Sequence, residues 1–300
     1  MIQLYNSECL EKLKELEDNS VDAIVTDPPY FISFMNKGWD KEDGIASKKE
    51  FWKECLRVTK PGGYLLAFGH SRTHHRLFTA VEDGGWEIRD TIMWLYGSGF
   101  PKSKNLSDGW GTALKPAHGP ICMARKPFAA SAQNVFKETG LGGINIDACR
   151  IPCDDKSKFP IGIYNVNTTI GKIRTEMRTG DSNMESRFPA NIILDEEAGA
   201  ILDGQTDNAS RFFYCPKVSG KERGKDNNHP TVKPIALMEY LIKLVSKEGA
   251  TILDPFMGSG STGIGAKCLN RSFIGIEMDE GYYTIASKRI DRINNNRRIK

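Results

Sequence analysis

The residues best equipped for chemistry in this 300-residue sequence are the consecutive Asp27, Pro28, Pro29 and Tyr30. They follow an apolar run over 21–25 that predicts a buried strand, and the two prolines prevent further ladder pairing. In open α/β sheets ligands bind at the carboxyl ends of strands, where this tetrapeptide is expected. Asp27 and the Pro28 carbonyl can accept hydrogen bonds from an amino group, and Tyr30 offers a stacking face. The tetrapeptide therefore suits a planar, amine-bearing substrate such as a nucleobase, although an ordinary turn has the same composition.

A second cluster, near the C-terminus, is typical of a cofactor loop. Gly258, Gly260 and Gly263 have G-x-G-x-x-G spacing between a predicted strand and a predicted helix, and Glu277 follows them. Such glycines let a ligand approach the backbone, and the Glu277 carboxylate can accept hydrogen bonds from both ribose hydroxyls. No lysine precedes Ser261, which excludes a Walker phosphate loop. The pattern serves any adenosine-containing cofactor, so it does not separate NAD from S-adenosylmethionine.

Asp254, directly after the predicted strand, favours S-adenosylmethionine. An acid aimed at the cofactor would repel a pyrophosphate, whereas it can accept a hydrogen bond from the ammonium group of a methionine moiety. We therefore expect S-adenosylmethionine as the cofactor. An NAD-dependent oxidoreductase stays open as an alternative, but it would leave the tetrapeptide at 27–30 without a role.

With these motifs in this order, the sequence resembles the DNA amino-methyltransferases of the group in which the catalytic motif precedes the cofactor motif. The tetrapeptide at 27–30 matches the catalytic motif of that family, and Asp-Pro-Phe-Met-Gly-Ser-Gly at 254–260 matches its cofactor loop. His-Pro-Thr-Val-Lys-Pro at 229–234 stands upstream of the loop, and the combination is specific. The resemblance covers residues 1–125 and 189–294.

The resemblance implies a set of site residues and no metal. The catalytic residues are Asp27, Pro28, Pro29 and Tyr30. The cofactor-binding residues are Glu8, Thr231, Lys233, Asp254, Phe256, Gly258, Ser259, Gly260 and Glu277. At Glu8 the sequence departs from the family pattern, because Asn-Ser-Glu stands at 6–8 where Gly-Asp is commoner.

The mechanism that the resemblance implies is a methyl transfer without a covalent intermediate. The target base leaves the duplex, stacks on Tyr30 and is held through its amino group by Asp27 and the Pro28 carbonyl, so that transfer depends on positioning. In this family an Asp-headed tetrapeptide favours adenine N6. Cytosine N4 stays open because it presents the same amino donor, and so does an amine in RNA or protein. Trp94 and Phe100 are candidates for the wall of the base pocket.

The elements that must position these motifs predict an α/β fold, with a doubly wound, mostly parallel Rossmann-like sheet covered on both faces. Strands are expected at 2–5, 21–25, 64–68, 87–96, 250–253 and 273–276, with an antiparallel strand at 120–125. Helices are expected between them, capped by Ser7, by Ser47 with Glu50, and by Thr231. The resemblance implies a circular permutation, in which 2–5 supplies the strand that should follow 273–276.

We expect one methyltransferase domain that is interrupted by an insert. Residues 1–127 form its catalytic half, 229–300 its cofactor-binding half, and 128–228 an inserted target-recognition region. The most variable part of the insert, 154–187, is polar and weakly periodic. A separate reader of base edges in duplex DNA would explain such a segment, although a long surface loop has the same composition.

The composition is ordinary for a soluble globular protein, and we expect a cytoplasmic location. The net charge of +3 permits a polyanionic partner without requiring one, and no apolar run is long enough to span a membrane. Seven cysteines without a Cys-x-x-Cys pair predict reduced thiols and no zinc ribbon. The expected partner is double-stranded DNA. The sequence leaves open a monomer or a homodimer, and a cognate restriction endonuclease.

Overall fold

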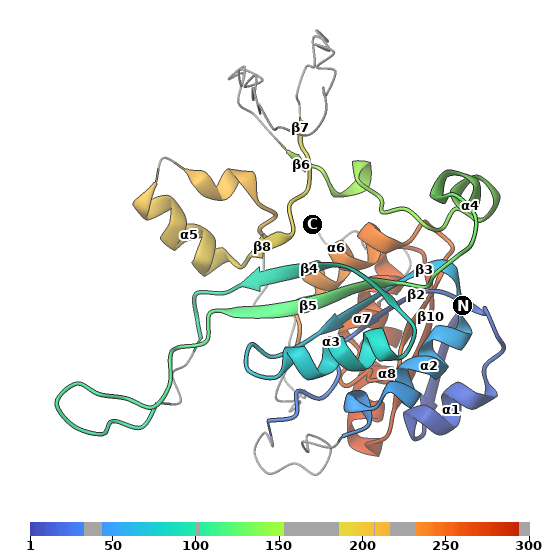
Figure 1. Cartoon of the computed structure of the whole chain (residues 1–300), viewed down its shortest axis with the longest axis horizontal. Helices are drawn as coiled ribbons and strands as arrows, with labels where there is room; N and C mark the ends of the chain where they lie inside the picture. The colour runs from blue at the N-terminus through green and yellow to red at the C-terminus, as the bar shows by residue number, and fades with distance from the viewer. Residues whose placement is uncertain (33–43, 100–102, 153–185, 207, 217–231, 294–300) are drawn as a thin grey trace, which may run out of the picture.

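A mixed sheet of eight strands forms the centre of the fold (Figure 1). The computed structural model describes residues 1–32, 44–99, 103–152, 186–206, 208–216 and 232–293. The strands lie in the order β1 (Ile2–Asn6), β10 (Ser272–Glu277), β9 (Thr251–Asp254), β2 (Val21–Thr26), β3 (Thr59–Phe68), β5 (His118–Arg125), β4 (Glu87–Leu95) and β8 (Ile192–Leu194).

The first five strands in this order are parallel, and β5 runs antiparallel to both of its neighbours. The N-terminal strand β1 pairs with β10, with Ile2 opposite Phe273, so the prediction that 2–5 lies beside the strand at 273–276 is confirmed. The antiparallel strand predicted at 120–125 is confirmed as β5. Every residue of β2 is buried, as expected for a strand covered on both faces.

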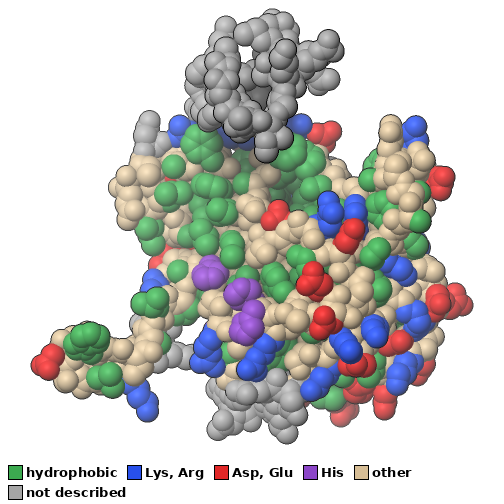
Figure 2. Space-filling view, viewed as in Figure 1, with side chains coloured by type: hydrophobic (Ala, Val, Ile, Leu, Met, Phe, Trp, Pro, Cys, Tyr) green, Lys and Arg blue, Asp and Glu red, His purple; other side chains and the backbone are tan. Residues whose placement is uncertain are grey.

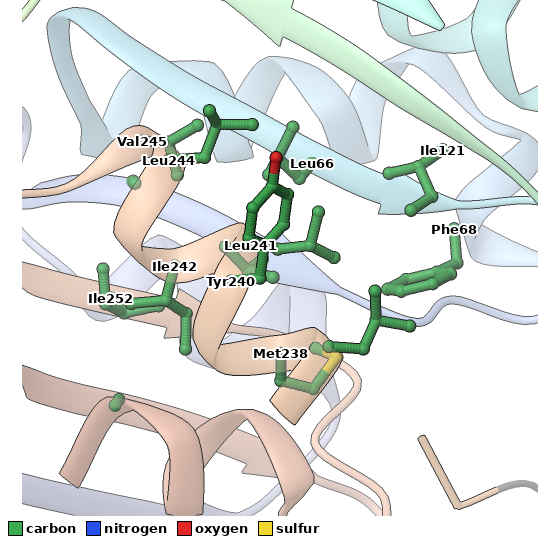
Figure 3. Close-up of a cluster of buried hydrophobic side chains, with 14 of the residues drawn as sticks. Leu66, Phe68, Ile121, Met238, Tyr240, Leu241, Ile242, Leu244, Val245 and Ile252 are labelled. Atoms are coloured by element: carbon green, nitrogen blue, oxygen red, sulfur yellow. The ribbon is translucent and has the colours of Figure 1, made fainter. Parts of the chain in front are cut away.

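Helices cover both faces of the sheet. On one face pack α6 (Ile235–Val245), α7 (Ser261–Cys268) and α8 (Glu280–Asp291). On the other face pack α1 (Cys9–Glu15), α2 (Lys49–Val58) and α3 (His74–Asp83). Figure 3 shows how α6 fills the first core, where Met238 and Leu241 lie among side chains from the strands such as Phe68. The predicted doubly wound α/β architecture is confirmed.

Two of the predicted helix caps are wrong. The N-cap of α1 is Glu8 rather than Ser7, because the Glu8 carboxylate accepts the Glu11 amide at 2.8 Å. Ser47 does not cap α2. It closes the 3₁₀ turn η3 (Ile45–Ser47), where its hydroxyl donates to the Gly44 carbonyl at 2.7 Å, and Lys48 precedes the helix without a side-chain cap.

The helix predicted to start after Thr231 begins later. Pro234 is the N-cap of α6, which starts at Ile235. A residue before proline is disfavoured in the helical region, so Lys233 stays outside the helix. Thr231 itself lies outside the described residues.

Part of the predicted insert joins the main sheet. The strand β8 pairs in parallel with β4, and α5 (Glu196–Gln205) follows it. Tyr214 stacks on Tyr240 of α6 with ring centroids 4.0 Å apart. The remaining elements of this region are α4 (Ala132–Thr139), η4 (Asp147–Cys149), β6 (Ile151–Pro152), β7 (Ser186–Arg187) and η5 (Ala209–Phe212). The domain boundaries stay a prediction, and 154–185 lie outside the described residues.

Among the described residues, no helix combines the length and apolar character that crossing a bilayer requires. The same part of the chain holds no group of histidine, cysteine or acidic side chains able to bind a metal ion.

Candidate active site

The two motifs meet at the carboxyl edge of the sheet. Strands β2 and β9 are direct neighbours, with Ile24 opposite Leu253. Two positions beyond Ile24, the Thr26 hydroxyl donates to the Asp254 carboxylate at 2.6 Å, across 228 residues of sequence. Because Thr26 directly precedes Asp27, this bond ties the start of the tetrapeptide to the start of the glycine loop. The two motifs, more than 200 residues apart in the sequence, therefore lie side by side.

Asp254 is the buried centre of that junction, with 1% of its surface exposed. Besides Thr26, the Thr262 hydroxyl donates to its other oxygen at 2.6 Å, and the Phe256 amide donates at 3.1 Å. Burial raises the pKa of Asp254 to about 6, while the hydroxyl donors act in the opposite direction. The carboxylate thus organises the loop from within, and its predicted contact with a cofactor ammonium stays a prediction.

The glycine loop adopts the conformation that its composition predicts. Gly258 has φ +52° and Gly260 has φ +83°, a region that glycine enters without steric cost. The Gly258 amide donates to one oxygen of Glu277 at 2.8 Å, and the Asp279 amide donates to the other at 2.9 Å. Burial raises the pKa of Glu277. The loop and the next strand's carboxylate are therefore one connected unit at the edge of the sheet.

The residues present fit an adenosine-containing cofactor. The Ser261 hydroxyl, at the start of α7, is buried and has no hydrogen-bond partner among the described residues. Ser259 is buried, and its hydroxyl accepts a bond from Arg289 at 2.9 Å. The Phe256 ring packs on Phe51 with centroids 5.1 Å apart. Such a ligand would supply the missing hydrogen-bond partner of the Ser261 hydroxyl, next to the glycine turn and the Glu277 carboxylate.

The tetrapeptide forms a closed polar triangle with Lys233. The Tyr30 hydroxyl donates to one oxygen of Asp27 at 2.5 Å, and the Lys233 ammonium group forms an ion pair with the other. The same ammonium group lies 3.0 Å from the Tyr30 hydroxyl. The sequence grouped Lys233 with the cofactor residues, whereas the contacts seen here are with the tetrapeptide. Pro28 is buried and Pro29 is partly buried.

Aromatic side chains surround this triangle. The Lys233 ammonium lies 4.8 Å from the centre of the Phe68 ring, and Trp94 meets Phe68 edge-on with centroids 6.4 Å apart. The indole nitrogen of Trp94 is buried without a hydrogen-bond partner in the described structure. Trp94 therefore stands near the site, as its prediction as a wall residue requires. Phe100, the other wall candidate, lies outside the described residues.

The segment that follows β3 supports the tetrapeptide from the side. The Thr73 hydroxyl donates to the Tyr30 carbonyl at 2.6 Å, and the His70 ring lies 6.0 Å from the Tyr30 ring. Phe31, which follows the tetrapeptide, is buried with φ +62°, an uncommon conformation for a bulky residue. The chain therefore turns sharply after Tyr30 and is anchored there by the Phe31 ring.

Sequence reasoning missed three residues that build the site: Thr26, Phe68 and Thr73. Thr26 stood next to Asp27, and a buried hydroxyl at the end of an apolar strand is a usable signal that a polar partner exists. Phe68 and Thr73 carried no such signal, because neither stands next to a motif that marks a site. Glu8, predicted near the cofactor, is seen capping α1.

A known family model matches most of the chain. The model of the N6/N4 methyltransferase family, described as DNA methylase, matches residues 21–288. That range contains both the tetrapeptide and the glycine loop.

Two curated relatives match nearly the whole chain. Type II methyltransferase M.HpaI of Haemophilus parainfluenzae is 30% identical over 299 residues, which cover 96% of this chain and 74% of that protein. Type II methyltransferase M.HindIII of Haemophilus influenzae is 26% identical over 347 residues, which cover 98% of this chain and 96% of that protein.

Solved structures share the fold at lower identity. The M1.HpyAVI–SAM complex aligns with a TM-score of 0.53 at 23% identity, covering 97% of this chain and all of that one. PvuII DNA methyltransferase, named as cytosine-N4-specific, aligns with a TM-score of 0.63 at 16% identity, covering 98% of this chain and 87% of that one. At these identities the likeness concerns the fold alone.

Proposed function

Because this chain belongs to the N6/N4 DNA methylase family, it is an S-adenosylmethionine-dependent methyltransferase of DNA amino groups, and we propose that its target is adenine N6. The observation that best supports this reaction is the hydrogen bond between Thr26 and Asp254, which brings the tetrapeptide and the cofactor loop together. Adenine is favoured by the acid that heads the tetrapeptide, Asp27.

In this proposal the chain positions two reactants. S-adenosylmethionine, when bound, supplies an electrophilic methyl group on a sulfonium. The loop from Gly258 to Gly260 and the Glu277 carboxylate hold the cofactor. Asp27 and the Pro28 carbonyl accept the two N–H groups of the base, which aims the nitrogen lone pair at the methyl group. The nitrogen–methyl bond forms as the sulfur–methyl bond breaks, and the extra proton leaves the nitrogen afterwards.

The fold does not decide between adenine and cytosine, since a cytosine-N4-specific enzyme shares it. Both bases present an exocyclic amino donor, so hydrogen bonding to Asp27 accommodates either. The relatives are named type II methyltransferases. On that basis we propose sequence-specific modification of DNA within a restriction-modification pair.

Basic side chains beside the site support a DNA partner. An open cleft of about 560 Å³ lies between α2 and α3, and its lining includes Lys48, Lys49, His75 and Arg76 together with Glu50 and Asp83. Figure 2 shows histidine and basic side chains gathered on this face. Thr73, in the same segment, holds the Tyr30 carbonyl. A phosphate backbone tracking this cleft would pass close to the tetrapeptide.

The test is methylation of unmodified duplex DNA with labelled S-adenosylmethionine, followed by nucleoside mass spectrometry. The parent should produce N6-methyldeoxyadenosine, and Asp27→Ala should be slower by at least about 10²-fold, because the amine loses its orienting acceptor. Asp291→Ala, at the exposed end of α8, is the matched control and should behave as the parent. N4-methyldeoxycytidine in the digest would contradict the adenine assignment, and an inactive parent would contradict the whole function.

A further inference from the structure

Each oxygen of the Asp27 carboxylate already has a donor before any base arrives. One oxygen accepts the Tyr30 hydroxyl at 2.5 Å and the other is paired with the Lys233 ammonium group. Each oxygen can accept a second hydrogen bond, so an amine binds Asp27 either beside one of these two donors or in its place. The two are not equivalent, because the hydroxyl is neutral and can rotate, whereas the ammonium carries a charge that has to be balanced.

The surroundings of Lys233 make its departure unfavourable. Its side chain is only 10% exposed, and the described structure places the Phe68 ring beneath the ammonium group at 4.8 Å. A charge in such a place needs a partner, and Asp27 is the carboxylate that pairs with it. Pro234 and the buried Ile235 follow directly, which anchors the Lys233 backbone in the core.

We propose that Lys233 is a positioning residue that acts through Asp27 and not a cofactor-binding residue. This inference rests on the proposed function of the site. The incoming amine replaces the Tyr30 hydroxyl on one oxygen of Asp27, while Lys233 keeps the other and holds the carboxylate in its orientation. When the methylated nitrogen sheds its proton, the proton passes to the oxygen that Tyr30 had vacated and then to water. Lys233 neither gains nor loses a proton.

Replacing the ammonium separates positioning from cofactor binding. In Lys233→Met, kcat for DNA methylation should fall by about 10²-fold, since the carboxylate is no longer held. The Kd for S-adenosylmethionine, measured by calorimetry on the DNA-free protein, should stay at the parent's value. Lys233→Arg keeps the charge and should recover part of kcat. A raised Kd with an unchanged kcat would assign Lys233 to the cofactor and overturn the proposal.

A double-mutant cycle tests whether Lys233 acts through Asp27. If it does, Asp27→Ala combined with Lys233→Met should be no slower than Asp27→Ala alone. Fully additive losses would overturn the proposal. Each single variant leaves one member of the pair without its partner, whereas the double variant leaves neither charge unpaired. Thermal unfolding of all three variants therefore accompanies the rate measurements and separates a folding defect from a loss of positioning.

The control is Lys243→Met, a partly buried lysine in the last turn of α6, which should leave kcat and Kd unchanged. An active parent with an unaltered Lys233→Met would overturn this inference alone. An inactive parent would overturn it together with the proposed function.

Discussion

A single buried carboxylate, Asp254, links the two halves of the site. Water would solvate this group better than the protein interior does, and the rise of its pKa to about 6 expresses that cost. Hydroxyl donors from Thr26 and Thr262 offset part of it. The protein thus keeps a buried acid with a raised pKa at the point where the tetrapeptide and the glycine loop join, and perturbed pKa values are typical of functional sites.

The burial of Asp254 predicts a pH dependence of stability. Its pKa is about 6 when folded, against an ordinary 3.8, so the folded state binds this proton more tightly than the unfolded chain. The free energy of unfolding should therefore fall as pH rises from about 4 to about 6, by about 3 kcal/mol from this group. Above that window the folded carboxylate is ionised and carries its full desolvation cost.

Denaturant unfolding at a series of pH values on the parent and Asp254→Asn measures this contribution. The asparagine does not titrate, so the parent's extra slope between about pH 4 and 6 should be missing from the variant. Glu277, whose pKa is also raised, acts in both proteins and cancels from the comparison. Parallel pH curves for the two proteins would contradict the prediction.

At the level of elements, the turn between β9 and α7 is constrained by both backbone conformation and packing. Gly260 is the N-cap of α7 with φ +83°, and a Cβ atom there would lie 3.0 Å from the Cβ of Ala286 on α8. A side chain would therefore meet both backbone strain and a packed neighbour. The turn packs the start of α7 against α8, so a change in the turn should alter both the shape of the cofactor loop and the stability of the protein.

Gly260→Ala should lower the free energy of unfolding by about 1–3 kcal/mol and weaken S-adenosylmethionine binding, because a non-glycine residue is strained at this φ. Denaturant unfolding and calorimetry check the two effects. The matched control is Gly204→Ala in α5, where a Cβ would meet nothing within 4 Å. That change should stabilise by up to about 0.5–1 kcal/mol, since alanine has a higher helix propensity than glycine. Equal effects at both glycines would count against the argument.

For the whole molecule, the carboxyl edge of the sheet gathers the functional surfaces. Strands β2 and β9 end there with their motifs, and α3 starts there with a basic segment tied to Tyr30. The connection between β4 and β5 projects from the sheet on the same side (Figure 1). A duplex approaching this edge would meet charge and catalytic groups together, as extrusion of a base requires.

Removal of basic side chains at and next to the cleft between α2 and α3 should weaken DNA binding in a salt-dependent way. Replacing Lys48, Arg72 and Arg76 together by alanine should make the plot of log K against log salt shallower, by about 0.9 for each phosphate that the protein no longer neutralises. Fluorescence anisotropy with a labelled duplex at several salt concentrations measures the slope. Lys14→Ala, in the last turn of α1 toward the opposite edge, should leave it unchanged. An unaltered slope in the triple variant would place the DNA elsewhere.

Much of the fold was predictable because its signals are local. The strands and their order of appearance follow from short apolar runs separated by glycine, proline and capping residues, and each run could be identified by itself. The residues that cap the helices were harder to predict from the sequence. Ser7 and Glu8 are adjacent, and the side chain of either can accept a hydrogen bond from a backbone amide. The choice between them therefore depends on how the chain enters α1. The start of α6 was misplaced because Pro234 restrained the residue before it.

The chemistry of the site was set by residue type, since an amine needs an acceptor such as Asp27 and a cofactor loop needs glycines at 258 and 260. Which of these polar side chains pair with one another was decided only by the tertiary structure. Lys233 meets Asp27 across 206 residues, and Thr26 meets Asp254 across 228. Nothing local distinguishes a lysine that will neutralise a distant carboxylate from one that will face solvent. Such pairs exist because neighbouring parallel strands bring remote chain ends to one edge, and burial there forces each polar group to find the partner that folding supplies.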